Sequence, residues 1–347
     1  MPPGPEQIAE AIDRLASGGL VAFPTETVYG LGASALDASA VARVFKAKGR
    51  PATNPLIVHV SGVDMARTLA SDWPARAETL ARAFWPGPLT LVVGRHERVP
   101  KIVAGGGGTV AVRCPDHPLT LALIEALGTP IVGPSANLSG RISPTTPEHV
   151  RMSFPDEASS DGNGVAVLDG GACRGGIEST VVSVASDGPA VVLRTGLISA
   201  DRIAAVLEMP VEVAQSHPDA GAGERSNQGQ AASPGLIGPH YQPRTPTRLA
   251  DRPAIERASE GEAVLSLGPA ATAARVIAMP TDAAGYAARL YAALHEADSL
   301  RVTRVLVECP GVGSTMRERA LGGDRAAGEE AALWRAIMDR LHRACAD

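Results

Sequence analysis

Aromatic residues and cysteines are scarce in this chain. Phe, Trp and Tyr together make up 3% of the 347 residues, which leaves few surfaces on which single-stranded bases could stack. The four cysteines are scattered and form no C-x-x-C pair, so neither a zinc site nor a disulfide scaffold is expected, and the thiols should be reduced. No run approaches the roughly 18 apolar residues of a membrane span, and no signal peptide is evident. We therefore expect a cytoplasmic protein with no membrane association.

An excess of basic residues is also absent. The 32 Lys and Arg against 37 Asp and Glu give a net charge of −5, so no general attraction to a nucleic-acid backbone is expected. Hydrophobic residues at 45% and charged residues at 20% are ordinary for a globular protein. Because the chain is longer than a single core usually supports, we expect two domains.

Apolar residues in the first half alternate between helical and strand spacing, which predicts an α/β fold. Helices are expected over residues 6–16, 38–48, 77–84, 119–127 and 201–207, and strands over residues 20–23, 56–60, 89–93, 109–112, 130–132, 180–184 and 191–193. From about residue 215 to 244 the sequence becomes small, polar and aperiodic, and it ends in a proline-rich stretch, as expected of a linker.

The last hundred residues start a second α/β pattern. Strands are expected over 263–267 and 302–307, with a helix over 286–297 between them and a final helix over 331–344. A strand, a helix and a strand in this order predict a parallel sheet with a right-handed crossover. The charged stretch 314–330, rich in Gly and Ala, is expected to form a surface loop.

Two cations, Lys48 and Arg50, follow helix 38–48 in the sequence K-G-R-P-A-T-N. Cations this close are seldom buried without an anion, and arginine forks onto phosphate oxygens while lysine supplies a point charge. Ser135 and Asn137, after the apolar stretch P-I-V-G-P, offer neutral donors for the same ligand. Each element alone also fits a structural role, as a solvated helix end or as a helix cap or Asx turn. Together they predict a polyphosphate pocket.

Further candidates lie in or beside apolar strands. A lone histidine in a strand, such as His59, is more often structural than functional, and Arg113 could anchor a carboxylate or form a structural ion pair. Ser179, at a strand entrance, could contact a ligand or only satisfy backbone groups. The glycine run 105–108 lacks the ending of a phosphate loop, and no base pairs with Cys173 in the sequence. We expect a pocket that binds and stabilises charge, without a covalent nucleophile.

Several segments taken together resemble one family. They are F-P-T-E-T-V-Y-G-L-G at 23–32, F-K-A-K-G-R-P-x-x-N-P-L-I-V-H-V at 45–60, V-R-C-P at 112–115 and P-S-A-N-L-S-G at 134–140. These motifs are similar to those of the YrdC-like threonylcarbamoyl-AMP synthases, in their long, two-domain form. The resemblance implies a YrdC-like twisted mixed sheet with helices around a concave pocket over 1–212, a linker crossing the active site over 213–246, and a smaller Rossmann-like parallel-sheet domain over 247–347.

The resemblance also implies a reaction. L-threonine, bicarbonate and ATP, the last with Mg²⁺ on its phosphates, would give L-threonylcarbamoyl-AMP and pyrophosphate for the threonylcarbamoyladenosine modification of tRNA. The product would pass to a tRNA threonylcarbamoyltransferase, and no stable binding of tRNA by this chain is expected. By motif, the catalytic tetrad on the ATP phosphates would be Lys48, Arg50, Ser135 and Asn137. Further nucleotide contacts would come from Asn54, Thr109, Ser143, Arg194 and Tyr241. Threonine would be held by Thr27, His59, Arg113 and Ser179.

Two departures and two alternatives accompany this resemblance. Before the pair His240-Tyr241, the residues Leu236–Pro239 replace the basic and aromatic residues usual in the linker, and the stretch 314–330 is an apparent insertion.

A non-catalytic RNA-binding module of the same fold is disfavoured by the acidic charge and the scarcity of aromatics. Carbamoyl transfer in a hydrogenase-maturation protein normally brings zinc-finger cysteines and an acylphosphatase-like segment, and the sequence contains neither.

Overall fold

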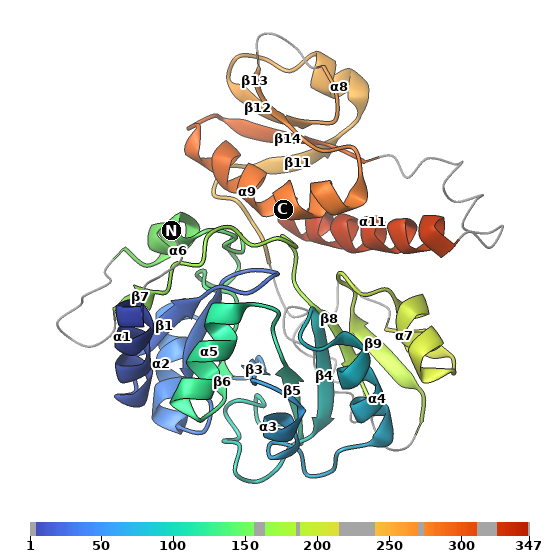
Figure 1. Ribbon diagram of the computed structural model, residues 1–347. Coiled ribbons are helices and arrows are strands. Elements are labelled where there is room, and N and C mark those ends of the chain that lie inside the picture. The colour runs from blue at the N-terminus through green and yellow to red at the C-terminus, as the bar shows by residue number, and fades with distance from the viewer. Residues whose placement is uncertain are drawn as a thin grey trace. The chain divides into compact units, whose positions relative to one another are not determined.

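The computed structural model describes residues 5–155, 164–184, 188–214, 240–269, 274–310 and 325–345. The chain divides into two compact units (Figure 1). The first holds Met1–Ser139, Pro144–Cys173 and Glu178–Gly238, and the second holds Gly140–Ser143, Arg174–Ile177 and Pro239–Asp347. Most of the expected linker, residues 215–239, lies outside the described residues. No helix in the described part of the chain is long and apolar enough to span a membrane.

A mixed sheet of ten strands forms the centre of the first unit, in the order β10-β9-β8-β4-β5-β3-β6-β2-β1-β7. The strands are β1 (Leu20–Phe23), β2 (Gly30–Ser34), β3 (Ile57–His59), β4 (Leu89–Gly94), β5 (Thr109–Arg113), β6 (Ile131–Val132), β7 (Val165–Val167), β8 (Thr180–Ser183), β9 (Ala190–Arg194) and β10 (Val211–Val213). Both faces of the central strands are covered, which explains why their sequences read as continuous apolar runs.

Alternation along the strands divides the core between the two faces of the sheet. Val21 and Phe23 of β1 pack in one cluster with apolar residues of two helices, α1 (Pro5–Ala16) and α5 (Pro118–Leu127). Leu20 and Ala22 belong to the larger cluster, which includes residues of α2 (Ala38–Lys48) and α4 (Ala75–Phe84). The other helices of this unit are α3 (Val63–Arg67), α6 (Pro147–Ser153) and α7 (Ala200–Leu207).

The middle of this sheet sets two polar side chains next to each other. β3 runs parallel to β5, and His59 is the register partner of Arg113. Val58 and Val60 lie in the larger core cluster, so alternation turns His59 to the opposite face. Because register partners point to the same face, His59 and Arg113 emerge together at the carboxyl ends of the two strands.

Local signals at both ends of α2 determine where its last residue lies. Asp37 caps the amino end by accepting hydrogen bonds from the backbone N–H groups of Ser39 and Ala40. Gly49 ends the helix in the left-handed region at φ +59°, and the N–H of Arg50 bonds to the carbonyl of Phe45. The chain therefore turns sharply directly after Lys48 and carries Arg50 into the following loop.

The second unit contains a parallel sheet of four strands in the order β11-β14-β12-β13. Its elements are β11 (Thr247–Ala250), α8 (Arg252–Glu256), β12 (Glu262–Ser266), β13 (Arg275–Ala278), α9 (Ala283–Ser299), β14 (Arg304–Glu308) and α11 (Arg325–Ala344). Tyr286 of α9 and Trp334 of α11 meet edge to face, with ring centroids 5.2 Å apart. The expected α/β class, with a mixed sheet and a smaller parallel sheet, is confirmed.

One local expectation about the second unit is wrong. The stretch 314–330 was expected to be a surface loop, but α11 begins at Arg325, so its last six residues are helical. The run R-A-A-G-E-E consists mostly of good helix formers, and it continues in register into the apolar stripe that follows. Residues 311–324 lie outside the described residues.

Candidate active site

Lys48 joins two motifs that lie almost ninety residues apart in the sequence. Its side chain is 3% exposed, and its ammonium group donates to the backbone carbonyls of Ser135 and Asn137. The Lys48 carbonyl in turn accepts from the N–H of Ser139 at 2.8 Å. Burial, with a smaller contribution from Arg50, holds the pKa of Lys48 well below its usual value. An ammonium group has three donors, so one N–H of Lys48 has no acceptor among the described residues.

The loop after Lys48 is shaped largely by its own backbone. Nη2 of Arg50 donates to the carbonyl of Pro55 at 3.0 Å, and the N–H of Asn54 bonds to the carbonyl of Pro51. Gly105, at φ +59°, packs so closely that a Cβ there would lie 2.4 Å from the carbonyl oxygen of Thr53. The glycine run therefore supports this loop by close backbone contact, which only glycine allows.

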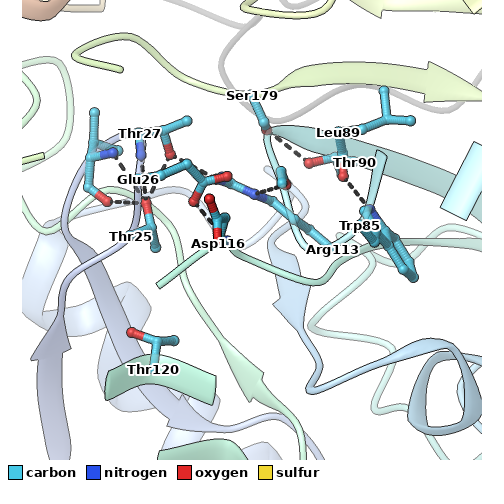
Figure 2. Close-up of polar contacts among 12 residues, drawn as sticks. Thr25, Glu26, Thr27, Trp85, Leu89, Thr90, Arg113, Asp116, Thr120 and Ser179 are labelled. Atoms are coloured by element: carbon cyan, nitrogen blue, oxygen red, sulfur yellow. Dashed lines mark hydrogen bonds and ion pairs between the residues drawn. The ribbon is translucent and has the colours of Figure 1, made fainter. Parts of the chain in front are cut away.

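Arg113 is the centre of a second, buried cluster (Figure 2). Its side chain is 4% exposed, and its Nη2 lies 2.7 Å from Oε1 of Glu26 and donates to Oγ1 of Thr27 at 3.0 Å. Its Nε donates to the carbonyl of Gly87 at 3.2 Å. Nη1 makes no hydrogen bond to any residue that the structure describes, so the donors on one edge of the guanidinium group have no partner there. Thr25 completes the cluster with a 2.8 Å contact between its hydroxyl and that of Thr27.

His59, beside Arg113 in the sheet, is buried and uncharged. Its ring meets the edge of Phe23 at a centroid distance of 5.2 Å, and a Cβ on Gly133 would lie 2.6 Å from its Nδ1. Nδ1 is fully enclosed and has no hydrogen-bond partner in the described part of the chain. Burial and the charge of Arg113 hold the pKa of His59 well below its usual value, so the imidazole is neutral near pH 7.

Ser179 is held from two sides. Its hydroxyl lies 2.8 Å from that of Thr90, and it accepts from Nη2 of Arg194 at 3.1 Å. The Nε of Arg194 donates to the carbonyl of Ser179, also at 3.1 Å. Arg194, expected to contact a nucleotide, is thus used here to fix the position of Ser179.

The remaining candidates lie elsewhere in the fold. Thr109 begins β5, four residues before Arg113, so the two are about 13 Å apart along the strand. Ser143 and Tyr241 belong to the second unit. There the Ser143 carbonyl lies 3.2 Å from Nε2 of His295, and the ring of Tyr241 stacks on Tyr291 with centroids 5.4 Å apart.

Two residues of the buried cluster were not expected from the sequence. Glu26 lies inside the quoted segment F-P-T-E-T-V-Y-G, but a carboxylate was given no role in a pocket expected to bind anions. Thr90 lies within a strand that reads as plain core, and only the pairing of β4 with β8 places its hydroxyl against Ser179. The sequence signal for Glu26 was its position next to Thr27.

Two cysteines of the first unit, Cys114 and Cys173, are buried. Burial raises the pKa of Cys173 to about 12, and the same effect raises that of Cys114 to about 12, so neither thiol ionises readily near pH 7. Within the described part of the chain, no group of three or more His, Cys, Asp or Glu side chains could hold a metal ion.

Fold and site together define an α/β protein with two buried basic side chains, one at the end of helix α2 and one at the end of strand β5. A family model named for Sua5, YciO and YrdC, described as "Telomere recombination", matches residues 13–196, and a second model, "Threonylcarbamoyl-AMP synthase, C-terminal domain", matches residues 198–346. The chain belongs to this family, in its two-domain form, and is an enzyme of the nucleotidyltransferase type.

Named relatives agree with the family. The threonylcarbamoyl-AMP synthase of Pyrococcus abyssi is 44% identical over 253 residues, which are 72% of this chain and 70% of that protein. The synthase of Bacillus subtilis is 44% identical over 246 residues, 71% of this chain and 67% of that protein. The crystal structure of P. abyssi Sua5 with L-threonine is 38% identical, with a TM-score of 0.80, over 97% of this chain and 94% of that chain.

Proposed function

We propose that this protein is an L-threonylcarbamoyladenylate synthase that joins L-threonine, bicarbonate and ATP. The observation that carries the proposal is the open edge of the Arg113 guanidinium group, beside Thr27 and the neutral His59. A buried arginine with free donors suits a carboxylate, and a hydroxyl next to it suits a small polar amino acid. A relative of this chain was crystallised with L-threonine, which supports the same substrate.

The proposed chemistry balances without a protein nucleophile. The threonine amine and bicarbonate give a carbamate and water. A carbamate oxygen then attacks the α-phosphorus of ATP, the bond to the bridging oxygen breaks, and pyrophosphate leaves. Positioning and charge neutralisation would supply most of the rate enhancement, as in other transfers at phosphorus.

Lys48 and the Ser135–Asn137 segment would hold the ATP phosphates. Lys48 brings one unused N–H, and the hydroxyl of Ser135 makes no hydrogen bond to any residue that the structure describes. Arg50 would add a forked contact to the same oxygens. Mg²⁺ would arrive with ATP, bound to phosphate oxygens.

On the amino-acid side, Nη1 of Arg113 would bind the threonine carboxylate. His59 would act as a neutral hydrogen-bonding group, because its pKa lies well below its usual value. Ser179, fixed by Thr90 and Arg194, would complete this side. A neutral histidine adds no charge that would compete with the phosphate side for an anion.

Other parts of the proposal reach beyond these clusters. Further nucleotide contacts are proposed for Asn54, Thr109, Ser143, Arg194 and Tyr241. We also propose that the linker covers the site during the reaction, since both the carbamate and the mixed anhydride react with water. The product would pass to a tRNA threonylcarbamoyltransferase.

Pyrophosphate release tests this function directly. Release from ATP should require L-threonine and bicarbonate together, and mass spectrometry should detect threonylcarbamoyl-AMP. Omission of either substrate should reduce release to background. Release that continues at the same rate without threonine would contradict the proposal. Salt-sensitive RNA binding by a protein without nucleotide turnover would favour an RNA-binding module instead.

A further inference from the structure

Glu26 is a buried carboxylate in the cluster to which nothing above assigns a function. It is 6% exposed and lies between Thr25 and Thr27, three residues after the end of β1. Burying a carboxylate is costly unless it is paired and hydrogen-bonded. Its two oxygen atoms face different partners, and this division indicates what the residue does.

One oxygen of Glu26 holds the arginine, and the other holds the backbone. Oε1 lies 2.7 Å from Nη2 of Arg113, while Oε2 accepts from the N–H of Asp116 at 3.1 Å (Figure 2). Asp116 follows β5 by three residues, so Glu26 is tied both to the side chain at the end of β5 and to the segment after it. The carboxylate is therefore fixed in position independently of the arginine.

Glu26 determines which edge of the Arg113 guanidinium group remains open. A guanidinium group has five N–H donors in a rigid plane. Nε donates to the carbonyl of Gly87, and Nη2 donates to Oγ1 of Thr27. Nη2 also lies 2.7 Å from Oε1 of Glu26, an ion pair that lacks the geometry of a hydrogen bond. Rotation about the end of the side chain would break these contacts together. The plane is thus locked, and the two donors of Nη1 are left unused.

We propose that Glu26 is a positioning residue, which locks the Arg113 guanidinium group so that Nη1 faces the carboxylate of the amino-acid substrate. This inference rests on the proposed function, in which Arg113 binds threonine. Without the Glu26 carboxylate, Arg113 keeps two neutral partners and can swing its charge towards other carbonyl groups. The two donors of Nη1 would then face the substrate carboxylate for only part of the time.

Steady-state kinetics of Glu26→Gln test the proposal. Glutamine keeps the shape and can still accept from the N–H of Asp116, but it loses the charge that holds Nη2. We expect the KM for L-threonine to rise roughly 10- to 100-fold, by analogy with the loss of a residue that orients a metal ligand. The KM for ATP should stay within about twofold, since the phosphates are bound by other residues. Glu26→Asp keeps the charge with a shorter reach and should give a smaller rise in the same KM.

The second unit offers a matched control. Glu262 is also 6% exposed, is paired with Arg304 and accepts from the backbone N–H of Ser259 at 2.8 Å. Glu262→Gln therefore removes a similarly buried carboxylate from an ion pair outside the cluster, although the arginine partner there is 43% exposed. It should lower the thermal midpoint as Glu26→Gln does, but it should leave the KM for threonine unchanged.

The outcomes separate the proposal from the function on which it rests. A wild-type protein without threonine-dependent pyrophosphate release overturns the proposed function. An active wild type whose Glu26→Gln variant loses only thermal stability, with both KM values unchanged, overturns the positioning function alone. An equal rise in both KM values also overturns it. If Glu26→Gln does not fold, calorimetric binding of L-threonine to Glu26→Asp decides, and wild-type affinity there would overturn the proposal.

Discussion

The two sides of the candidate site balance their buried cations in different ways. Lys48 bonds to two backbone carbonyls, which carry only partial charges, and its strongest charged influence is the cation Arg50. Arg113 instead faces a full carboxylate at 2.7 Å. The Lys48 side therefore gains most from an anionic ligand, whereas the Arg113 side is balanced before its ligand arrives. The comparison supports the proposal that a polyphosphate binds to the first side and a single carboxylate to the second.

Loss of the Lys48 cation should have the largest effect. In Lys48→Met we expect the rate of pyrophosphate release to fall about 100- to 1,000-fold, because a donor aimed at the developing phosphate charge is lost. The protein should remain folded, since a buried ammonium group with a depressed pKa contributes little to stability. Lys46→Met, an exposed lysine in the last turn of the same helix, serves as the control and should keep wild-type activity. Equal loss in both variants, or none in Lys48→Met, would remove the difference between the two sides.

Replacement of Arg113 by lysine should separate the two substrates. Lysine keeps the charge but cannot reach Gly87, Thr27, Glu26 and a ligand at once, so Arg113→Lys should raise the KM for L-threonine roughly 10- to 100-fold. The KM for ATP should change little. Arg304→Lys, in the paired control of the second unit, should affect neither. A rise in the KM for ATP alone would place Arg113 on the phosphate side.

Loss of the Thr90 hydroxyl, which contacts Ser179, should have a smaller effect than the substitutions of Lys48 and Arg113. Thr90→Val keeps the shape and removes the oxygen that lies 2.8 Å from the Ser179 hydroxyl. A hydrogen bond of this kind contributes about 1 kcal/mol, so we expect a rise of about fivefold in the KM for L-threonine. An unchanged KM would show that Arg194 alone is enough to position Ser179.

Sequence patterns predicted the elements whose signals are local. Helix α2 spans the predicted residues because Asp37 caps one end and Gly49 ends the other. Strand β2, in contrast, was not predicted, since G-L-G-A-S lacks β-branched residues. It exists because Gly30 and Gly32 leave room for the ring of Phe23, which a Cβ at Gly30 would approach to 2.6 Å. This reason becomes visible only when β1 and β2 pair.

In the candidate site, too, features with a local sequence signal were predictable, and features that depend on contacts between distant segments were not. The chemistry of K-G-R and S-A-N suggested that Lys48 and Ser135 act on one ligand, and the structure brings them into contact. The ion pair of Glu26 with Arg113 depends on the loop after β1 meeting the end of β5, and neither segment specifies this meeting by itself. Contacts made between loops are therefore the part that the sequence could not predict.

The smallest effect that we predict is that of replacing His59 on the pH dependence of the free energy of unfolding. Its pKa in the folded protein lies below that of the unfolded chain, about 6.5, so between these two values the unfolded state binds more protons. The free energy of unfolding should therefore rise with pH in this window and fall as the pH drops below about 6.5, by at most about 1.4 kcal/mol per pH unit from this group. In His59→Gln this contribution is absent, so chemical denaturation from pH 5 to 8 should give a flatter dependence, whatever the absolute stability of the variant. A dependence as steep as that of the wild type would mean that His59 takes up a proton inside the fold. The amino-acid side would then carry a second cation next to Arg113, and it would depend on an anionic ligand as the Lys48 side does.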